Sequence, residues 1–236
     1  MRTLLTAHWV NLLTATYETN KNFLKKFLPA KTELNDWNGK YMMSLVGFMF
    51  LKPVLLGIPS PIYRSFEEIN LRFYVRHKEK KNWKNGVVFI KEIAPARIIG
   101  LTAAWIYKEN FISLPMKHDF YEDNESRNIK YACKTNHEWK HFYLKTTRSD
   151  SEPGEESIES FIRDHYLGYT KAGRDQTMEF QVEHRPWKIF PSQSFEMNLD
   201  IKNIYGDEFE EYFAQTPLTS FLMDGSFTKV SWPVLL

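Results

Sequence analysis

One ten-residue stretch, Phe66 to Val75 (FEEINLRFYV), carries a row of side chains whose types could do chemistry. Its alternation is typical of a β-strand and places Glu68, Asn70, Arg72 and Tyr74 on one face, with apolar residues on the other. Successive residues on one face lie roughly 7 Å apart between Cα atoms, so their side chains can touch. In such a row an arginine can bind a carboxylate in a fork, and Glu68 is a candidate acid or base for proton transfer.

Two interpretations of this row stay open. Spacing alone favours a solvent-facing row in which Glu68 and Arg72 form a weak surface contact, because most half-buried strands have one polar face. In the sharper interpretation the same four side chains form a polar wall inside a barrel or cleft and bind a ligand.

A second candidate, His184, follows the alternating segment Gln176 to Glu183 and falls on the same face as Phe180 and Val182. A lone histidine at the end of an apolar row is more often a structural residue than a catalyst. His137 and His141 are four apart, but in a predicted turn and strand, so we expect no metal site. The sequence contains no nucleophile elbow, phosphate loop or dinucleotide fingerprint, and we expect no cofactor.

The elements that would position these residues are mainly strands. Predicted strands cover 40–51 (with a bend or bulge at Gly47), 67–77, 86–93, 98–107, 176–183 and 195–199, and a hairpin joins 129–135 to 138–145. Asn85-Gly86 is a turn signal consistent with a hairpin between the second and third of these strands. Short helices are expected over 20–28, from Ser157 to near Gly168, and from Asp207 to Pro217. We expect a polar connection at 117–128 and a flexible loop at 146–156.

Composition agrees with a single β-rich domain spanning 1–236. Phe, Tyr and Trp make up 16% of the chain, and such rings pack well on pleated sheets. The net charge of +2 and a basic run broken by Glu79 favour a solvated hairpin tip over a nucleic-acid surface. Cys133 is the single cysteine, and no uncharged run is long enough to span a membrane. We therefore expect a soluble cytoplasmic protein that binds neither nucleic acid nor membrane.

Several ordered motifs together resemble one family, the YqjF-like family of unknown function in the acetoacetate decarboxylase-like superfamily. The resemblance covers nearly the whole chain and is densest in the first half. Its motifs are HWVNLL at 8–13, WNG at 37–39, SLVGF at 44–48, FEEINLRFYVRH at 66–77, GVVFIKEI at 86–93, YKENF at 107–111, LPM at 114–116, FIRDHYLGY at 161–169 and HRPW at 184–187.

This resemblance implies a mainly β fold (α+β by helix content): a single antiparallel β-barrel-like double sheet with a central cavity and a few short peripheral helices. The superfamily's decarboxylases use a Schiff-base lysine beside a second lysine, and matching their strand to this chain places the pair at about Phe111 and Ile112. Lys108 is three residues away and has no lysine neighbour. Ala104 stands where many relatives carry arginine, and Glu109 matches the family pattern without an assigned role.

Three functions remain from the sequence. The first is binding of a small organic acid or amphipathic molecule by Glu68, Asn70, Arg72, Tyr74, Glu109, Phe111 and His184. The second is an acid–base lyase or hydrolase that acts on a small carboxylate without a Schiff base. The third is a barrel packed with rings that binds nothing. A homo-oligomer is compatible with each.

Overall fold

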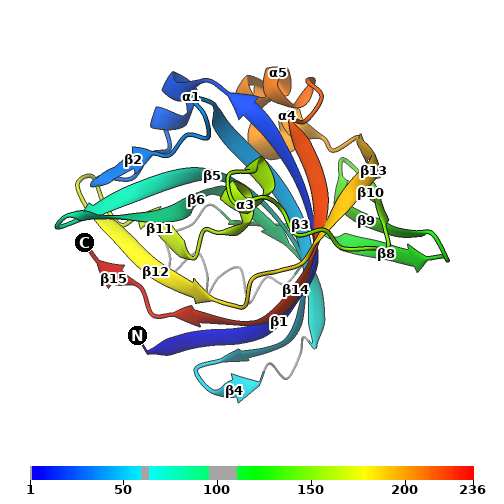
Figure 1. Cartoon of the computed structure of the whole chain (residues 1–236), viewed down its shortest axis with the longest axis horizontal. Helices are drawn as coiled ribbons and strands as arrows, with labels where there is room; N and C mark the ends of the chain where they lie inside the picture. The colour runs from blue at the N-terminus through cyan, green and yellow to red at the C-terminus, as the bar shows by residue number, and fades with distance from the viewer. Residues whose placement is uncertain (1, 60–63, 96–110) are drawn as a thin grey trace.

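Seven strands of the computed structural model, which describes residues 2–59, 64–95 and 111–236, form a ring (Figure 1). They are β1 (Thr3–Thr19), β3 (Tyr41–Leu55), β5 (Ser65–Glu79), β6 (Asn82–Ala94), β11 (Leu167–Lys171), β12 (Thr177–Glu183) and β14 (Thr219–Ser231). Neighbours pair in the order β12-β11-β6-β5-β3-β1-β14, and β14 pairs with β12 through Val182↔Val230 to close the ring. All these pairings are antiparallel except β11 with β6.

Four further strands extend the sheet away from the ring, to the right in Figure 1. They are β8 (Met116–Glu122), β9 (Ser126–Thr135), β10 (Glu138–Thr147) and β13 (Ile189–Met197), and β13 joins them to β14. The short strands β2 (Thr32–Leu34), β4 (Ile58–Pro59), β7 (Phe111–Ser113) and β15 (Val234–Leu235) pair along the ring strands. The architecture is thus mainly β and barrel-like, as the sequence predicted.

Gly47 brings the extension onto the outside of the ring. A Cβ atom at this position would lie 2.5 Å from Cζ of Phe142 and 2.8 Å from Cδ2 of Tyr131. Only glycine therefore lets the rings of β9 and β10 pack this closely on β3. The bulge expected at Gly47 lies instead in the partner strand β1, where the register with β3 shifts between Val10 and Leu13.

The helices of the described residues are short: α1 (Lys21–Lys25), α3 (Ile158–Arg163), α4 (Ile201–Tyr205), the 3-10 turn η1 (Asp207–Phe209) and α5 (Glu210–Phe213). The first two begin at side-chain caps. Asn20 Oδ1 accepts from the amide of Asn22 at 2.7 Å, and Ser157 Oγ accepts from that of Ser160 at 3.1 Å. Helix α3 ends at Arg163, earlier than the sequence suggested.

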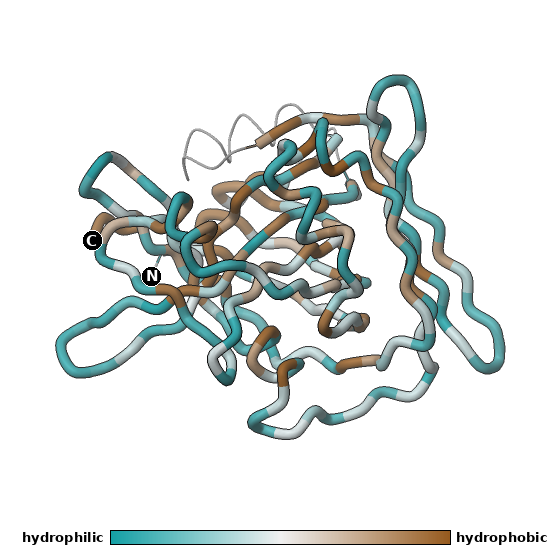
Figure 2. Tube along the Cα trace, turned by 90° about the horizontal axis from the view of Figure 1, so that it is seen from above, coloured by the Kyte–Doolittle hydropathy of each residue, from teal (hydrophilic) through white to brown (hydrophobic). Residues whose placement is uncertain are grey.

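Strand β5 separates two apolar layers. Its residues Ile69, Leu71, Phe73 and Val75 are fully buried in the outer core, between the ring, the extension and the helices α1, α4 and α5. The opposite face of β5 turns into the ring, where Tyr74 belongs to a second core with Ile162 of α3 and residues of β1, β3 and β14. Figure 2 shows hydrophobic residues gathered in the middle of the molecule and hydrophilic residues on the projecting hairpins.

Some predicted elements need correction. The β5–β6 hairpin exists, but its turn is at Lys80 and Lys81, so Asn85-Gly86 lies inside β6. The strands pair up to Glu79↔Asn82, and Lys80 in the turn adopts a positive φ of 55°. Residues 117–128 are not a mere connection, since β8 pairs with β9 from Met116 to Glu122. The strand predicted at 98–107 falls outside the described residues.

Candidate functional site

The polar row of β5 faces a cavity inside the ring. Glu68, Asn70 and Arg72 lie on the cavity wall. Glu68 and Asn70 are only 7% and 3% exposed, so the row does not face solvent. The remaining wall is largely apolar: Leu5, Trp9, Leu12, Val46, Phe48, Phe50, Phe89, Phe111, Phe180, Val182 and Val230, together with Glu92. The solvent-facing interpretation of the row is therefore wrong.

The cavity is small, with a volume of about 90 Å³. A buried water needs roughly 10–15 Å³ of such space, so the cavity suits a molecule with on the order of six non-hydrogen atoms. Drug-sized ligands occupy pockets of about 300–1,000 Å³.

Glu68 forms a buried carboxyl pair with Glu92, a residue that the sequence did not single out. The register of β5 with β6 shifts at Leu71/Arg72, where Leu71 pairs with Lys91 and Arg72 with Phe89. This bulge leaves Ile90 as the extra residue, so Phe89 and Glu92 both face the cavity although strict alternation would separate them. Burial raises the pKa of Glu68 well above its usual value, and the charge of Glu92 and its hydrogen bond to Glu68 raise it further. A hydrogen bond from Asn70 Nδ2 to Glu68 Oε1, at 3.3 Å, acts in the opposite direction. This pair therefore keeps a proton in the pH range where an exposed glutamate is ionised.

Three polar atoms of cavity-lining residues have no hydrogen-bond partner among the described residues. They are Asn70 Oδ1, Arg72 Nε and Trp9 Nε1, and each is shielded from solvent. Buried polar atoms are normally paired, because an unmade hydrogen bond costs about 1–3 kcal/mol. One acceptor and two donors thus remain available to a molecule in the cavity.

Tyr74 supports Arg72 from behind the cavity wall. The phenol is fully buried and hydrogen-bonds Arg72, Ser44 and, through Ser44, Thr16, with 2.5 Å from Ser44 Oγ to Tyr74 OH and 2.7 Å from Ser44 Oγ to Thr16 Oγ1. Burial raises the pKa of Tyr74, while the neighbouring Arg72 charge lowers it. Tyr74 is not part of the cavity lining itself, and its hydroxyl positions the guanidinium.

Two histidines, His165 and His184, lie near enough to Arg72 for its charge to act on them. His184 stacks on Trp187 with 3.7 Å between ring centroids, and its Nδ1 lies 2.8 Å from the carbonyl oxygen of Arg185. His165 packs between Tyr74 and Phe161. Burial lowers the pKa of each to about 4, and the nearby Arg72 charge lowers both further. His184 is thus a neutral, stacked residue outside the cavity lining.

Phe111 lies on the cavity wall, in the short strand β7 that runs parallel to β6, while Ile112 packs against the outer core. Among the described residues, no lysine lines this cavity. Ala104, Lys108 and Glu109 lie outside the described residues.

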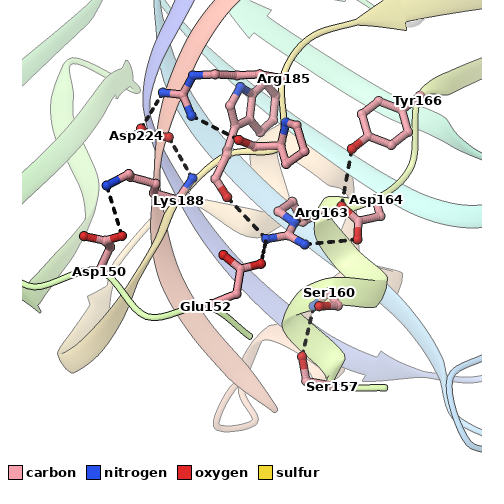
Figure 3. Close-up of polar contacts among 12 residues, drawn as sticks. Asp150, Glu152, Ser157, Ser160, Arg163, Asp164, Tyr166, Arg185, Lys188 and Asp224 are labelled. Carbon is pink, nitrogen blue, oxygen red and sulfur yellow. Dashed lines mark hydrogen bonds and ion pairs between the residues drawn. The ribbon is translucent and has the colours of Figure 1, made fainter. Parts of the chain in front are cut away.

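Figure 3 shows a second polar cluster, whose hydrogen bonds connect α3 to the segment between β12 and β13. Arg163 donates from Nε to Asp164 at 2.8 Å, from Nη1 to Glu152 at 3.3 Å, and from Nη1 to the main-chain oxygen of Trp187 at 3.5 Å. Trp187 in turn contacts Trp9 on the cavity wall, with 6.4 Å between ring centroids. The cluster therefore holds part of the wall in place.

Two features are absent from residues 2–59, 64–95 and 111–236. No three or more His, Cys, Asp or Glu side chains are grouped so that they could hold a metal ion. No helix in these ranges has the length and apolar character needed to cross a membrane.

Solved structures with this arrangement of strands share little sequence with the chain. Acetoacetate decarboxylase from Legionella pneumophila is similar with a TM-score of 0.66 and 10% identity, over 100% of this chain and 88% of that one. An acetoacetate decarboxylase-like enzyme from Sphingomonas wittichii RW1 has a TM-score of 0.66 and 14% identity, over 100% and 94%. The enduracididine biosynthesis enzyme MppR, complexed with pyruvate, has a TM-score of 0.65 and 11% identity, over 100% and 91%. These likenesses show an acetoacetate decarboxylase-like fold.

Sequence comparison confirms the expected family. The uncharacterised protein YqjF of Bacillus subtilis (strain 168) is 26% identical over 204 residues, which are 83% of this chain and 78% of that protein. The profile of DUF2071, described as an uncharacterised conserved protein, matches residues 6–225. The chain therefore belongs to the DUF2071, or YqjF-like, family.

Proposed function

We propose that this protein binds a small organic acid in the cavity of the ring. The observation that carries the proposal is Arg72, which lines the cavity and whose Nε has no hydrogen-bond partner in the described part of the chain. Charge-assisted hydrogen bonds to a carboxylate are strong, and the surrounding rings exclude the water that would weaken them.

Two further features support a carboxylate of few atoms. The volume of about 90 Å³ admits only a small molecule, and the apolar wall suits a short carbon chain. One protein of the same fold has been crystallised with pyruvate, which is such a molecule.

Binding is tested by thermal shift and calorimetry with matched pairs of acids and amides. We expect propionate, pyruvate or lactate to raise the melting temperature in a saturable way, while propionamide and lactamide do not. At a ligand concentration of about 100 times Kd, the gain is about 2.7 kcal/mol, or roughly 5–10 °C for a chain of this size. Equal shifts from acid and amide, or no shift from any acid, would overturn the proposal and favour the packed barrel.

A specific observation supports a second candidate, an acid–base lyase or hydrolase that acts on a small carboxylate without a Schiff base. Burial and the neighbouring Glu92 raise the pKa of Glu68 well above its usual value, and Glu68 stands on the cavity wall, as a general acid must. We expect Glu68→Gln to retain carboxylate binding but lose turnover, and borohydride with a β-keto acid to trap no lysine adduct. A trapped adduct would contradict this route.

A further inference from the structure

We infer that the cavity selects a hydroxy acid, that is, a short carboxylate carrying a hydroxyl group that can donate a hydrogen bond. This inference rests on the proposed binding of an organic acid and adds what the rest of that acid must offer. The observation behind it is the carbonyl oxygen of Asn70, an unpartnered acceptor on a residue that is only 3% exposed.

The orientation of the Asn70 amide follows from the carboxyl pair beside it. Glu68 and Glu92 hydrogen-bond each other, which requires a proton between two carboxyl groups. Glu68 Oε1 then accepts from Asn70 Nδ2 at 3.3 Å, and the Asn70 carbonyl oxygen is left without a donor. Because Glu68 and Glu92 use their proton between themselves, neither supplies the donor that Asn70 lacks among the described residues, and a ligand in the cavity can supply it.

The cavity therefore offers two kinds of unmet hydrogen bond to one small molecule. Arg72 Nε and Trp9 Nε1 can donate to a carboxylate, and Asn70 Oδ1 can accept from a hydroxyl. Asn70 and Arg72 are successive residues on one face of β5, roughly 7 Å apart between Cα atoms. A carboxylate and a hydroxyl separated by one to three carbon atoms match this spacing and the size of the cavity.

The same arrangement disfavours the corresponding oxo acid. A ketone carries no donor, so it would bury the Asn70 oxygen unpaired, as would an acid with no substituent. The penalty for one unpaired buried acceptor corresponds to about 5- to 150-fold in affinity. Sites that hydrogen-bond a substrate hydroxyl reject analogues without it for this reason.

The test is a calorimetric titration of the unaltered protein with two matched series: lactate, pyruvate and propionate, and 3-hydroxybutyrate, acetoacetate and butyrate. We expect the hydroxy acid in at least one series to bind 5-fold or more tightly than both analogues. Alanine is titrated as well, because an ammonium group also donates hydrogen bonds, and tighter binding of alanine than lactate would overturn the assignment of a hydroxyl.

A variant then assigns the preference to one residue. Asn70→Leu removes the acceptor, so it should weaken the hydroxy acid to the level of its analogues. Asn128→Leu, in β9 of the outer sheet, is the matched control and should keep the preference. A preference that persists in a folded Asn70→Leu protein would contradict the assignment.

The outcomes separate the two proposals. If no carboxylate binds, the proposed function fails. If carboxylates bind but hydroxy acids bind no more tightly than their analogues, only the inference about the hydroxyl fails. This outcome comes from the unaltered protein, so it does not depend on obtaining folded Asn70→Leu.

Discussion

Two arginines of this protein differ in what their donors contact. Arg163, whose side chain is 8% exposed, bonds Asp164, Glu152 and the main-chain oxygen of Trp187. Arg72 hydrogen-bonds Tyr74 but has no carboxylate partner in the described residues, and its Nε is unpaired. The first guanidinium is satisfied by the protein, whereas the second is left partly unsatisfied beside a cavity.

The difference indicates which polar groups stabilise the fold and which are available to bind a ligand. A paired arginine joins elements that are distant in sequence, here α3 and the segment after β12. An unpaired donor facing a cavity lowers stability by an amount that a ligand can recover on binding. Changing each arginine should therefore give opposite results in binding and stability measurements.

Loss of Arg72 should give the largest effect on binding. We expect Arg72→Met to lower the affinity for any carboxylate about 30-fold or more, because removing one partner of a desolvated charge pair typically costs 2–5 kcal/mol. The melting temperature without ligand should change little, since few bonds are lost. Arg76→Met is the control: Arg76 lies on the same strand, its side chain is 38% exposed, and it pairs with Glu33. Unchanged calorimetric affinity in Arg72→Met would remove Arg72 from the site.

Loss of Arg163 should act on stability. We expect Arg163→Met to reduce the free energy of unfolding by about 1–2 kcal/mol, since its carboxylate partners are partly exposed and such pairs contribute less. The melting temperature should fall by roughly 2–8 °C, as measured by calorimetric scanning. Carboxylate affinity of the folded variant should stay close to that of the unaltered protein. A large loss of affinity would show that the two arginines are coupled rather than separate.

The sequence predicted the row on β5 but not its counterpart on β6. Strict alternation of Glu68, Asn70, Arg72 and Tyr74 holds in the structure, so their common face could be read from spacing. Glu92 could not be found this way, because alternation groups it with Ile90 and only the bulge returns it to the cavity. A bulge depends on how two strands pair and leaves little trace in either strand alone.

Long-range packing explains the other gaps. Strands β1 and β14 were not predicted, although they are 17 and 13 residues long. Register shifts interrupt the alternation of β1, and its partners in β14 lie about 200 residues away in the sequence. Spacing also could not show whether the polar face of β5 met solvent or a cavity, since that depends on closure of the ring by β12 and β14. The family resemblance implied a barrel-like double sheet with a central cavity, which the alternation of single strands could not show.

The smallest expected effect is on the pH dependence of stability, to which the carboxyl pair and the two histidines contribute with opposite signs. Burial keeps the pKa of His165 and His184 at about 4, so the unfolded state binds more protons below pH 6.5 and stability falls with acid. Glu68 has the opposite sign. Its folded-state pKa is raised, so the stability associated with its protonated form is present at low pH and is lost as pH rises above its unfolded value of about 4.5.

Subtracting two melting curves isolates the Glu68 contribution. Glu68→Gln keeps a neutral polar side chain at every pH, so its melting temperature minus that of the unaltered protein should grow as pH rises from 4.5, by a few degrees for each kcal/mol. The histidines contribute equally to both proteins and cancel. Glu33→Gln, at a side chain 61% exposed, should show no such growth. If the Glu68→Gln difference stayed flat with pH, Glu68 would ionise equally in the folded and unfolded chain, and the proton of the carboxyl pair, on which the orientation of Asn70 depends, would be absent.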